Sequence, residues 1–125
     1  MSKRIIHTEN APKAIGPYSQ AVECNGMLFI SGQIPVNPAT GSIPEGIEAQ
    51  TEQVMKNIEA ILTEAGYTFS DVIKSTCLLS DIANFKAMNE IYARYYSSEC
   101  PARAAFAVRD LPLGVLVEIE TIAGR

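Results

Sequence analysis

Two charged side chains lie at strand positions where a surface charge would contribute little to stability, so we consider a chemical role for each. Arg103 follows Pro101 and Ala102 at the start of an expected strand. Its planar guanidinium suits bidentate binding of a carboxylate, which contributes about 1.5–3 kcal/mol. Glu118 lies among apolar neighbours, where desolvation raises a carboxyl pKa and suits a proton shuttle or a group that orients water. Each residue also has a purely structural alternative. Arg103 could form an ion pair with a neighbouring glutamate, and Glu118 could form an ion pair with Arg103 across an interface.

Two short glycine-containing polar segments are further candidates for ligand contacts. They are residues 16–20, which include Tyr18, and residues 31–35, which begin with Ser31 and Gly32. Side-chain hydroxyls and free backbone groups in such segments can face a ligand. Most segments of this kind are only turns, so the local pattern leaves both interpretations open.

Other familiar catalytic arrangements are absent from the sequence. His7 is the only histidine, so one chain cannot build a two-histidine ribonuclease centre or a histidine metal site, and no metal is expected. No GxGxxG, GxxxxGK[ST] or GxSxG motif occurs, which removes the usual signatures of nucleotide cofactors and serine hydrolases. Tyr92, Tyr95 and Tyr96 are more typical of core and interface packing than of a base-stacking platform.

Length, charge and cysteine usage narrow the function further. The 125 residues, 47% hydrophobic and 19% charged, predict one globular domain over residues 1–125. A net charge of -4 has the wrong sign for neutralising phosphates, so nucleic acid is not expected as a main partner. Cys24, Cys77 and Cys100 form no metal or redox motif and are expected to be reduced thiols in a cytoplasmic protein. Neither a signal peptide nor a run of ~18 apolar residues occurs, so no membrane is expected as a partner.

Hydrophobic periodicity supplies the elements that must position these residues. Asn25-Gly26 is typical of a type I′ turn and predicts a hairpin of residues 18–24 and 27–31. Apolar residues at helical spacing predict a helix over 47–65, which Gly66 caps. The remaining pattern predicts a long loop over 32–46, strands over 4–7, 73–79, 102–108 and 115–123, and a second helix that carries Phe85, Met88, Tyr92 and Tyr95 and stops before Cys100.

This element order indicates an α+β two-layer sandwich, in which both helices cover one face of a mixed six-stranded sheet. The other face also carries apolar residues. In the last strand, alternation directs Leu116, Glu118, Glu120 and Ile122 away from Val115, Val117 and Ile119. In the strand before it, Arg103, Ala105 and Ala107 share one face, opposite Phe106 and Val108. Since the domain is too small to fold over its second sheet face, we expect a homo-oligomer.

Seven segments occur in an order and spacing that match a known family over essentially the whole chain. They are GPYSQA at 16–21, SGQIP at 31–35, the NPATG loop, the helix ending EAG at 64–66, FKAMNEIYARYY, PARAA at 101–105 and EIE at 118–120. Together they resemble the Rid family, the reactive intermediate deaminases, formerly called the YjgF family or L-PSP ribonucleases. The arginine of the PAR motif is similar to that of the RidA-type subgroup.

The resemblance implies a chorismate-mutase-like fold assembled as a homotrimer, with active sites in clefts between subunits. It implies hydrolysis of 2-enamine and 2-imine acids, such as 2-aminoacrylate and 2-aminocrotonate, to 2-keto acids and ammonia without a cofactor. This is the reaction of a 2-iminobutanoate/2-iminopropanoate deaminase. Pyridoxal-phosphate-dependent dehydratases produce such intermediates, and the resemblance does not identify the preferred imine.

The same resemblance implies roles for individual residues. By motif position, Arg103 would hold the substrate carboxylate and Glu118 would position the attacking water. The remaining residues would line the cleft: Tyr18, Ser31 and Asn89 with their side chains, Tyr18 also helping to close the pocket, and Gly32 and Ala105 with backbone contacts. Many relatives carry a cysteine at the position of Ala105, so thiol chemistry is not available there in this chain.

Two other functions stay open at this point. In one, the same arginine cleft binds keto acids without turnover, as in a small-molecule sensor, or the protein acts as a holdase. In the other, the protein is an endoribonuclease or translation inhibitor, as the older family name implies. The net charge of -4 and the solitary histidine count against the second alternative.

Overall fold

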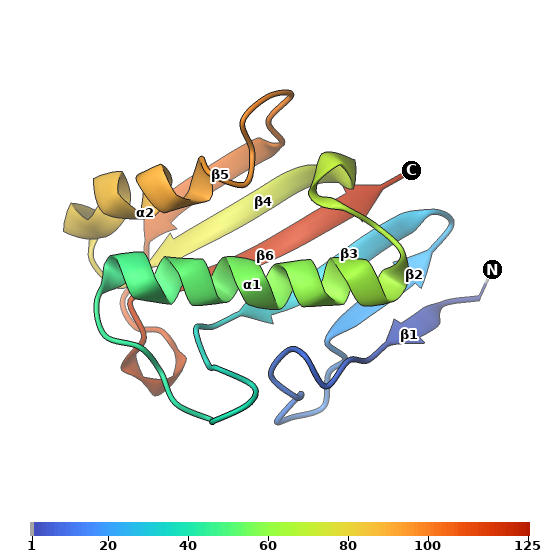
Figure 1. Ribbon diagram of the computed structural model, residues 1–125, viewed down its shortest axis with the longest axis horizontal. Helices are drawn as coiled ribbons and strands as arrows, with labels where there is room; N and C mark the ends of the chain where they lie inside the picture. Colours follow the sequence, from blue (N-terminus) through green and yellow to red (C-terminus); the bar gives the residue numbers. More distant parts are fainter. Residues whose placement is uncertain (1) are drawn as a thin grey trace.

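The computed structural model describes residues 2–125 as two layers, a sheet and two helices on one of its faces (Figure 1). The strands are β1 (Arg4–Ile6), β2 (Ala21–Cys24), β3 (Met27–Gln33), β4 (Val72–Leu79), β5 (Ala102–Ala107) and β6 (Val117–Gly124). The helices are α1 (Ile47–Ala65) and α2 (Phe85–Tyr92), and 3-10 turns cover Phe69–Asp71, Ile82–Asn84 and Pro112–Gly114. No helix within residues 2–125 is long and apolar enough to cross a membrane.

The sheet has the order β1-β2-β3-β6-β4-β5, with β6 between two segments far from it in sequence. Among the strands of residues 2–125, only β4 and β5 pair in parallel, and α2 forms the crossover between them. The other neighbouring strands are antiparallel. The predicted α+β sandwich with a mixed six-stranded sheet and both helices on one face is therefore confirmed.

The strongest local signals in the sequence correspond to observed structure. Asn25 and Gly26 have φ values of 53° and 75°, as a type I′ hairpin turn requires. Helix α1 begins at Ile47 and ends at Ala65, and Gly66 adopts the left-handed conformation (φ 85°) that accepts the helix end. Its buried apolar stripe includes every residue used to predict it: Val54, Ile58, Ile61, Leu62 and Ala65.

Several predicted boundaries are wrong. Most differ by one or two residues, such as the end of β3 at Gln33 and the start of β6 at Val117, and two differ by more. The strand expected from Tyr18 begins at Ala21, because the backbone N–H of Tyr18 donates to Gly16 O (2.8 Å) in a tight turn. The second helix ends at Tyr92 rather than just before Cys100. Beyond it, the Tyr95 N–H donates to Tyr92 O (3.1 Å) at the tighter spacing of a 3-10 turn.

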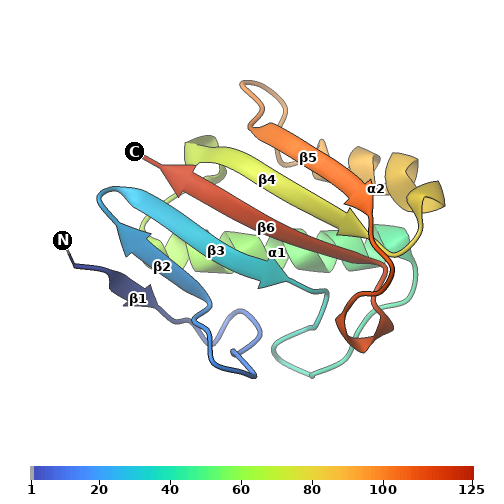
Figure 2. The ribbon, with the colours of Figure 1, turned by 180° about the vertical axis from the view of Figure 1, so that it is seen from behind.

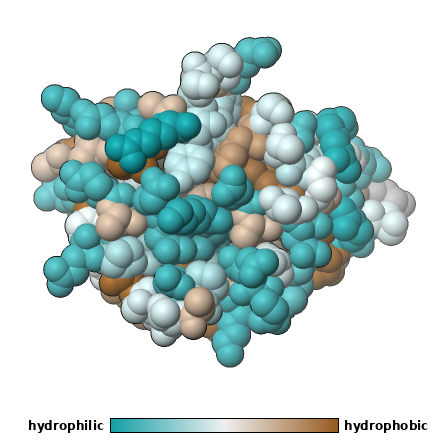
Figure 3. All heavy atoms as spheres, in the orientation of Figure 1, coloured by the Kyte–Doolittle hydropathy of each residue, from teal (hydrophilic) through white to brown (hydrophobic). Residues whose placement is uncertain are grey.

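The two faces of the sheet differ in what covers them. The helix side holds the core, in which Leu28, Ile58, Met88 and Ile119 are fully buried. Hydrophilic side chains cover most of the outer surface on that side (Figure 3). On the opposite face, the described part of the chain places no helix (Figure 2). Large apolar side chains there are about half exposed, namely Ile5, Phe29 and Phe106.

Candidate active site

Arg103 lies on β5 beneath helix α2, on the helix side of the sheet. Its Nη1 donates to Asn89 Oδ1 at 2.7 Å. The guanidinium carbon lies 5.0 Å from the ring centroid of Tyr92 and 5.5 Å from that of Phe85. Within residues 2–125, no carboxylate lies within ion-pair distance of Arg103. The chain thus holds a guanidinium by neutral partners and leaves its charge uncompensated.

Ala105 is the next residue of β5 on the same face as Arg103. It pairs in register with Cys77 of β4, whose thiol is buried. Burial raises the pKa of Cys77 to about 11, against the opposing effect of the Arg103 charge, so the thiol is protonated near neutral pH. The neutral methyl group of Ala105 and the neutral thiol of Cys77 therefore lie beside Arg103.

Glu118 lies on the other face of the sheet, across from the end of β3. A Cβ atom added to Gly32 would collide with the Glu118 carboxylate, so the absence of a side chain at position 32 makes room for it. Burial, followed by repulsion from the Glu120 carboxylate, raises the pKa of Glu118. This upward shift agrees with the prediction from the sequence that desolvation raises the pKa of Glu118. A carboxylate with a raised pKa is a better proton acceptor than an exposed one.

Ser31 directly precedes Gly32, and hydrogen bonds join it to the loop that carries Tyr18. The Ser31 side chain donates to Ser19 O at 2.6 Å, and its backbone N–H donates to Gln20 O at 3.0 Å. The register between β3 and β6 shifts between Ile30 and Gln33, which places Ser31 and Gly32 in an irregular stretch. The loop that carries Tyr18 is thereby joined to the strand end beside Glu118.

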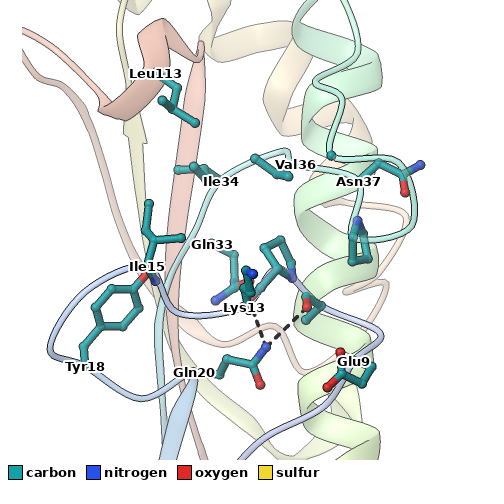
Figure 4. Close-up of a pocket in the computed structure, with 15 residues that line it drawn as sticks. Glu9, Lys13, Ile15, Tyr18, Gln20, Gln33, Ile34, Val36, Asn37 and Leu113 are labelled. Carbon is teal, nitrogen blue, oxygen red and sulfur yellow. Dashed lines mark hydrogen bonds between the residues drawn. The ribbon is translucent and has the colours of Figure 1, made fainter.

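A pocket of about 460 Å³ opens between this loop and the segment after β3 (Figure 4). Tyr18, Gly32 and Gln33 line it, together with residues that the sequence did not single out for function, among them Lys13, Val36 and Leu113. Buried Gln20 fixes the first wall, since its side-chain amide donates to Ala11 O and Pro12 O (3.3 and 2.9 Å). Arg103 and Glu118 are not lining residues of this pocket.

A second buried amide fixes the opposite wall of the pocket. Asn57 of α1 donates to Ile34 O and Val36 O, both at 3.1 Å. Its side chain is 1% exposed, and the two carbonyls belong to the segment that follows β3. Helix α1 therefore positions this part of the site as well as covering the core.

The predicted site residues therefore form two groups. The arginine group, Asn89, Arg103 and Ala105, faces the helix side, because Arg103 pairs with buried Ser75. The glutamate group, Tyr18, Ser31, Gly32 and Glu118, lies at the end of β3 and on the opposite face, where Glu118 pairs with Leu78. Successive residues of a strand point to opposite faces, so one chain does not bring the two charged side chains together.

Sequence reasoning missed the aromatic surroundings of Arg103. Phe85, Asn89 and Tyr92 follow one another at intervals of four and three residues, which places all three on one face of α2. The helical spacing contains this signal, but the spacing alone indicates only core packing. Within residues 2–125, no group of three or more His, Cys, Asp or Glu side chains could hold a metal ion.

Comparison with known proteins identifies the family. The family model described as Endoribonuclease L-PSP matches residues 8–124. A RutC family protein of Pyrococcus horikoshii is 56% identical over 122 residues, covering 97% of each chain. The chloroplastic Reactive Intermediate Deaminase A of Arabidopsis thaliana is 47% identical over 124 residues, covering 98% of this chain and 66% of that protein.

The architecture agrees with that of solved structures. TdcF from E. coli, crystallised with bound serine, superposes with a TM-score of 0.94 at 42% identity, and the match covers 98% of both chains. The fold, the family model and the similar sequences agree with the motifs found along the chain, and this chain belongs to the L-PSP endoribonuclease family, the family of the Rid and YjgF proteins.

Proposed function

We propose that this protein hydrolyses 2-enamine and 2-imine acids, such as 2-aminoacrylate and 2-aminocrotonate, to 2-keto acids and ammonia. The observation that carries the proposal is the Arg103 guanidinium, which Asn89 and two aromatic rings hold without a carboxylate partner in residues 2–125. Such a group is suited to a small carboxylate ligand. The name of the Arabidopsis relative and the serine bound to TdcF support a small amino-acid-like substrate.

Hydrolysis requires that water add to C2 of the imine and that the C–N bond then break. In the proposed mechanism, the substrate is the protonated imine, and the Glu118 carboxylate accepts a proton from water as the water oxygen bonds to C2. The C=N electron pair moves onto nitrogen in the same step. The protonated Glu118 then donates that proton to nitrogen, and the C–N bond breaks with its electron pair leaving on ammonia. As the ketone forms, the hydroxyl proton passes to the Glu118 carboxylate, which then gives it to the departing ammonia. Ammonium leaves, and Glu118 is again the carboxylate that began the cycle. The raised pKa of Glu118 supports this double role.

The proposed chemistry demands little from the protein. An iminium carbon is already electrophilic, so an acceleration of ~10³ to 10⁴ requires only about 4–5.5 kcal/mol of barrier reduction. One proton-transfer group typically supplies ~10² to 10⁴, and positioning of the carboxylate adds to it. A neutral thiol and a methyl group beside the anchor are compatible with this, because no nucleophile from the protein is needed.

The proposal also requires two copies of the chain. Since Arg103 and Glu118 point to opposite sides of one sheet, we place a complete site between the arginine group of one copy and the glutamate group of its neighbour. The half-exposed apolar side chains of the open sheet face support burial against further copies. A homotrimer of one-domain subunits, with three such sites, is the assembly that we propose.

The first test is a coupled assay in which a dehydratase generates 2-aminoacrylate from serine and pyruvate is followed. Wild-type protein should accelerate pyruvate formation over the protein-free reaction. Arg103→Ala should retain the oligomeric mass but lose at least about tenfold in kcat/KM, because it loses the charge-assisted hydrogen bonds to the carboxylate. If wild type matches the protein-free rate with both 2-aminoacrylate and 2-aminocrotonate, the proposal is wrong.

Mixed oligomers test whether the site is shared between chains. Arg103→Ala and Glu118→Ala proteins, each expected to be at least about tenfold less active than wild type when assayed alone, are unfolded together in equal amounts and refolded. If each site takes its arginine and its glutamate from different chains, random assembly restores about one quarter of the wild-type activity. If both residues come from one chain, no mixture contains an intact site, and the activity stays at the level of the separate variants.

The sensor alternative predicts that wild type binds a keto acid but does not accelerate hydrolysis. Calorimetry with 2-oxobutanoate, run beside the coupled assay, separates the two functions. The ribonuclease alternative has less support in this chain. Its only histidine, His7, lies exposed beside Glu9 (3.0 Å), and the net charge of -4 opposes RNA binding.

A further inference from the structure

The Arg103 guanidinium contacts three side chains of helix α2, which restrict its position. Asn89 accepts from Nη1, while the rings of Phe85 and Tyr92 lie about 5 Å from the guanidinium carbon. All three residues come from one face of α2. A single helix face therefore supplies two aromatic surfaces and one amide oxygen to one guanidinium. This accounts for one donor of Arg103 and leaves Nε and Nη2 without a partner in residues 2–125.

The aromatic ring of Tyr92 is itself firmly held. Its side chain is 5% exposed, and its ring centroid lies 4.7 Å from that of Tyr96. Its hydroxyl lies in a buried group with the hydroxyls of Tyr96 and Ser75. Ser75 is also the register partner of Arg103 on β4. The surface on which the guanidinium lies is therefore fixed by the core.

An arginine on an exposed strand position ordinarily samples many side-chain conformations, and ordering it upon binding weakens affinity. A guanidinium placed against aromatic faces is attracted by their negative π surfaces and loses part of this freedom before the ligand arrives. The amide oxygen of Asn89 adds a directional constraint, because it accepts from only one nitrogen. The unbound protein thus already presents Arg103 in a restricted orientation.

We propose that Phe85 and Tyr92 are positioning residues, which hold Arg103 so that Nε and Nη2 receive the carboxylate of the imino acid. This inference rests on the proposed function and adds to it the groups that determine carboxylate affinity. In the proposed complex, neither ring contacts the reacting carbon. Removal of a ring should therefore weaken binding of the substrate and of its keto-acid product more than it slows the chemical step.

The test compares variants that keep a ring with variants that remove it. Phe85→Tyr and Tyr92→Phe keep a ring, whereas Phe85→Leu and Tyr92→Leu remove it and retain an apolar side chain. The ring-removing variants should raise KM and the dissociation constant of 2-oxobutanoate about tenfold, with a smaller change in kcat. The ring-keeping variants should bind like wild type. Each oligomer is checked for mass and thermal unfolding.

A double-mutant cycle separates positioning from general stability. In an Arg103→Ala background, Phe85→Leu should cause no further loss of 2-oxobutanoate affinity, since the ring then has no guanidinium to hold. Additive losses, or ring-removing variants that bind 2-oxobutanoate like wild type, would overturn the inference while leaving the deaminase proposal in place. A wild-type protein that neither binds 2-oxobutanoate nor accelerates imine hydrolysis would overturn both.

Discussion

Gly32 is a residue whose identity follows from the side chain across from it. Its φ is not in the left-handed region, so the backbone conformation alone does not require glycine. The requirement is space, since the Glu118 carboxylate occupies the volume that a Cβ would take. The glycine and the glutamate therefore act as one unit, although 86 positions separate them in the sequence.

Gly32→Ala should displace Glu118 and reduce kcat by about tenfold or more, since misplacement of a catalytic group by ~1 Å can cost a factor of about 100. Stability should change little, because the atoms displaced belong to the far end of a flexible side chain. The measurement is kcat beside the unfolding midpoint. In a Glu118→Ala background the same methyl group should have no effect on kcat, and a further loss there would contradict this explanation.

The raised pKa of Glu118 gives a second prediction at this scale. The proposed mechanism needs the ionised carboxylate, so activity should be lost as pH falls through a pKa above the ordinary glutamate range. Glu120→Gln removes a repulsion that raises this pKa, and the acidic limb of the kcat/KM profile should move to lower pH. The protein-free rate is subtracted at each pH. A limb that does not move would indicate that another group titrates.

The sequence predicts roles for Arg103 and Glu118 from residue type and strand position, which are local properties. Which face each charged group occupies depends on registers between distant segments. Arg103 pairs with buried Ser75 and therefore lies on the helix side, whereas Glu118 pairs with Leu78 and lies on the open side. No local pattern contains that information. The aromatic residues around Arg103 were visible as a helical stripe, but the stripe does not say which residue it contacts.

At the scale of elements, the C-terminal end of α1 is joined to both ends of the chain. Arg4 of β1 donates to Ala65 O at 3.1 Å, and the last residue, Arg125, donates to Gly66 O. The Arg125 guanidinium also lies 4.2 Å from the ring centroid of Tyr67. Cations are favoured at this end of a helix, where carbonyl groups lack partners in the helix. These contacts connect α1 to both β1 and β6.

Gly66→Ala should lower the free energy of unfolding by about 1 kcal/mol, because an alanine is strained at φ 85°. A Cβ there meets only ordinary contacts with Arg125, so the cost comes from the backbone. Denaturant unfolding at fixed protein concentration measures it, with Glu64→Ala, at an exposed position of the last helical turn, as the control. Activity should stay unchanged. A Gly66→Ala protein as stable as wild type would contradict the backbone argument.

Elements with a strong local signal were the ones that could be predicted. The Asn25-Gly26 turn and the 47–65 helix combine periodicity with a residue suited to a left-handed conformation. The end of α2 could not be found in this way. There the apolar spacing continues to Tyr95, but Tyr95 and Tyr96 pack against Phe69 at 5.2 and 5.4 Å between ring centroids, and this contact accompanies a tighter turn.

At the scale of the whole molecule, the open sheet face carries large apolar side chains whose burial would favour association. Phe29 and Phe106 are 47% and 48% exposed there, beside partly buried Val22 and Ile122. Full burial of such a side chain contributes roughly 1.5–3 kcal/mol. Several copies of this face brought together supply a strong drive for association.

Phe29→Glu should shift the protein toward monomers and abolish deaminase activity, because a buried unpaired carboxylate opposes association. Sedimentation velocity measures the mass, and the coupled assay measures activity in the same samples. Ile82→Glu is the matched control, since Ile82 is 58% exposed but lies in the turn before α2. If Phe29→Glu keeps the wild-type mass, the open face is not the association surface.

The opposed directions of Arg103 and Glu118 also constrain the symmetry of any active assembly. A contact that joins the arginine group of one copy to the glutamate group of the next is head-to-tail, and such contacts either close into a ring or continue as a filament. A closed ring has as many complete sites as chains. An open row leaves an arginine group without a glutamate group at one end, and a glutamate group without an arginine group at the other. In a closed ring, every chain therefore contributes its arginine group to one complete site and its glutamate group to another.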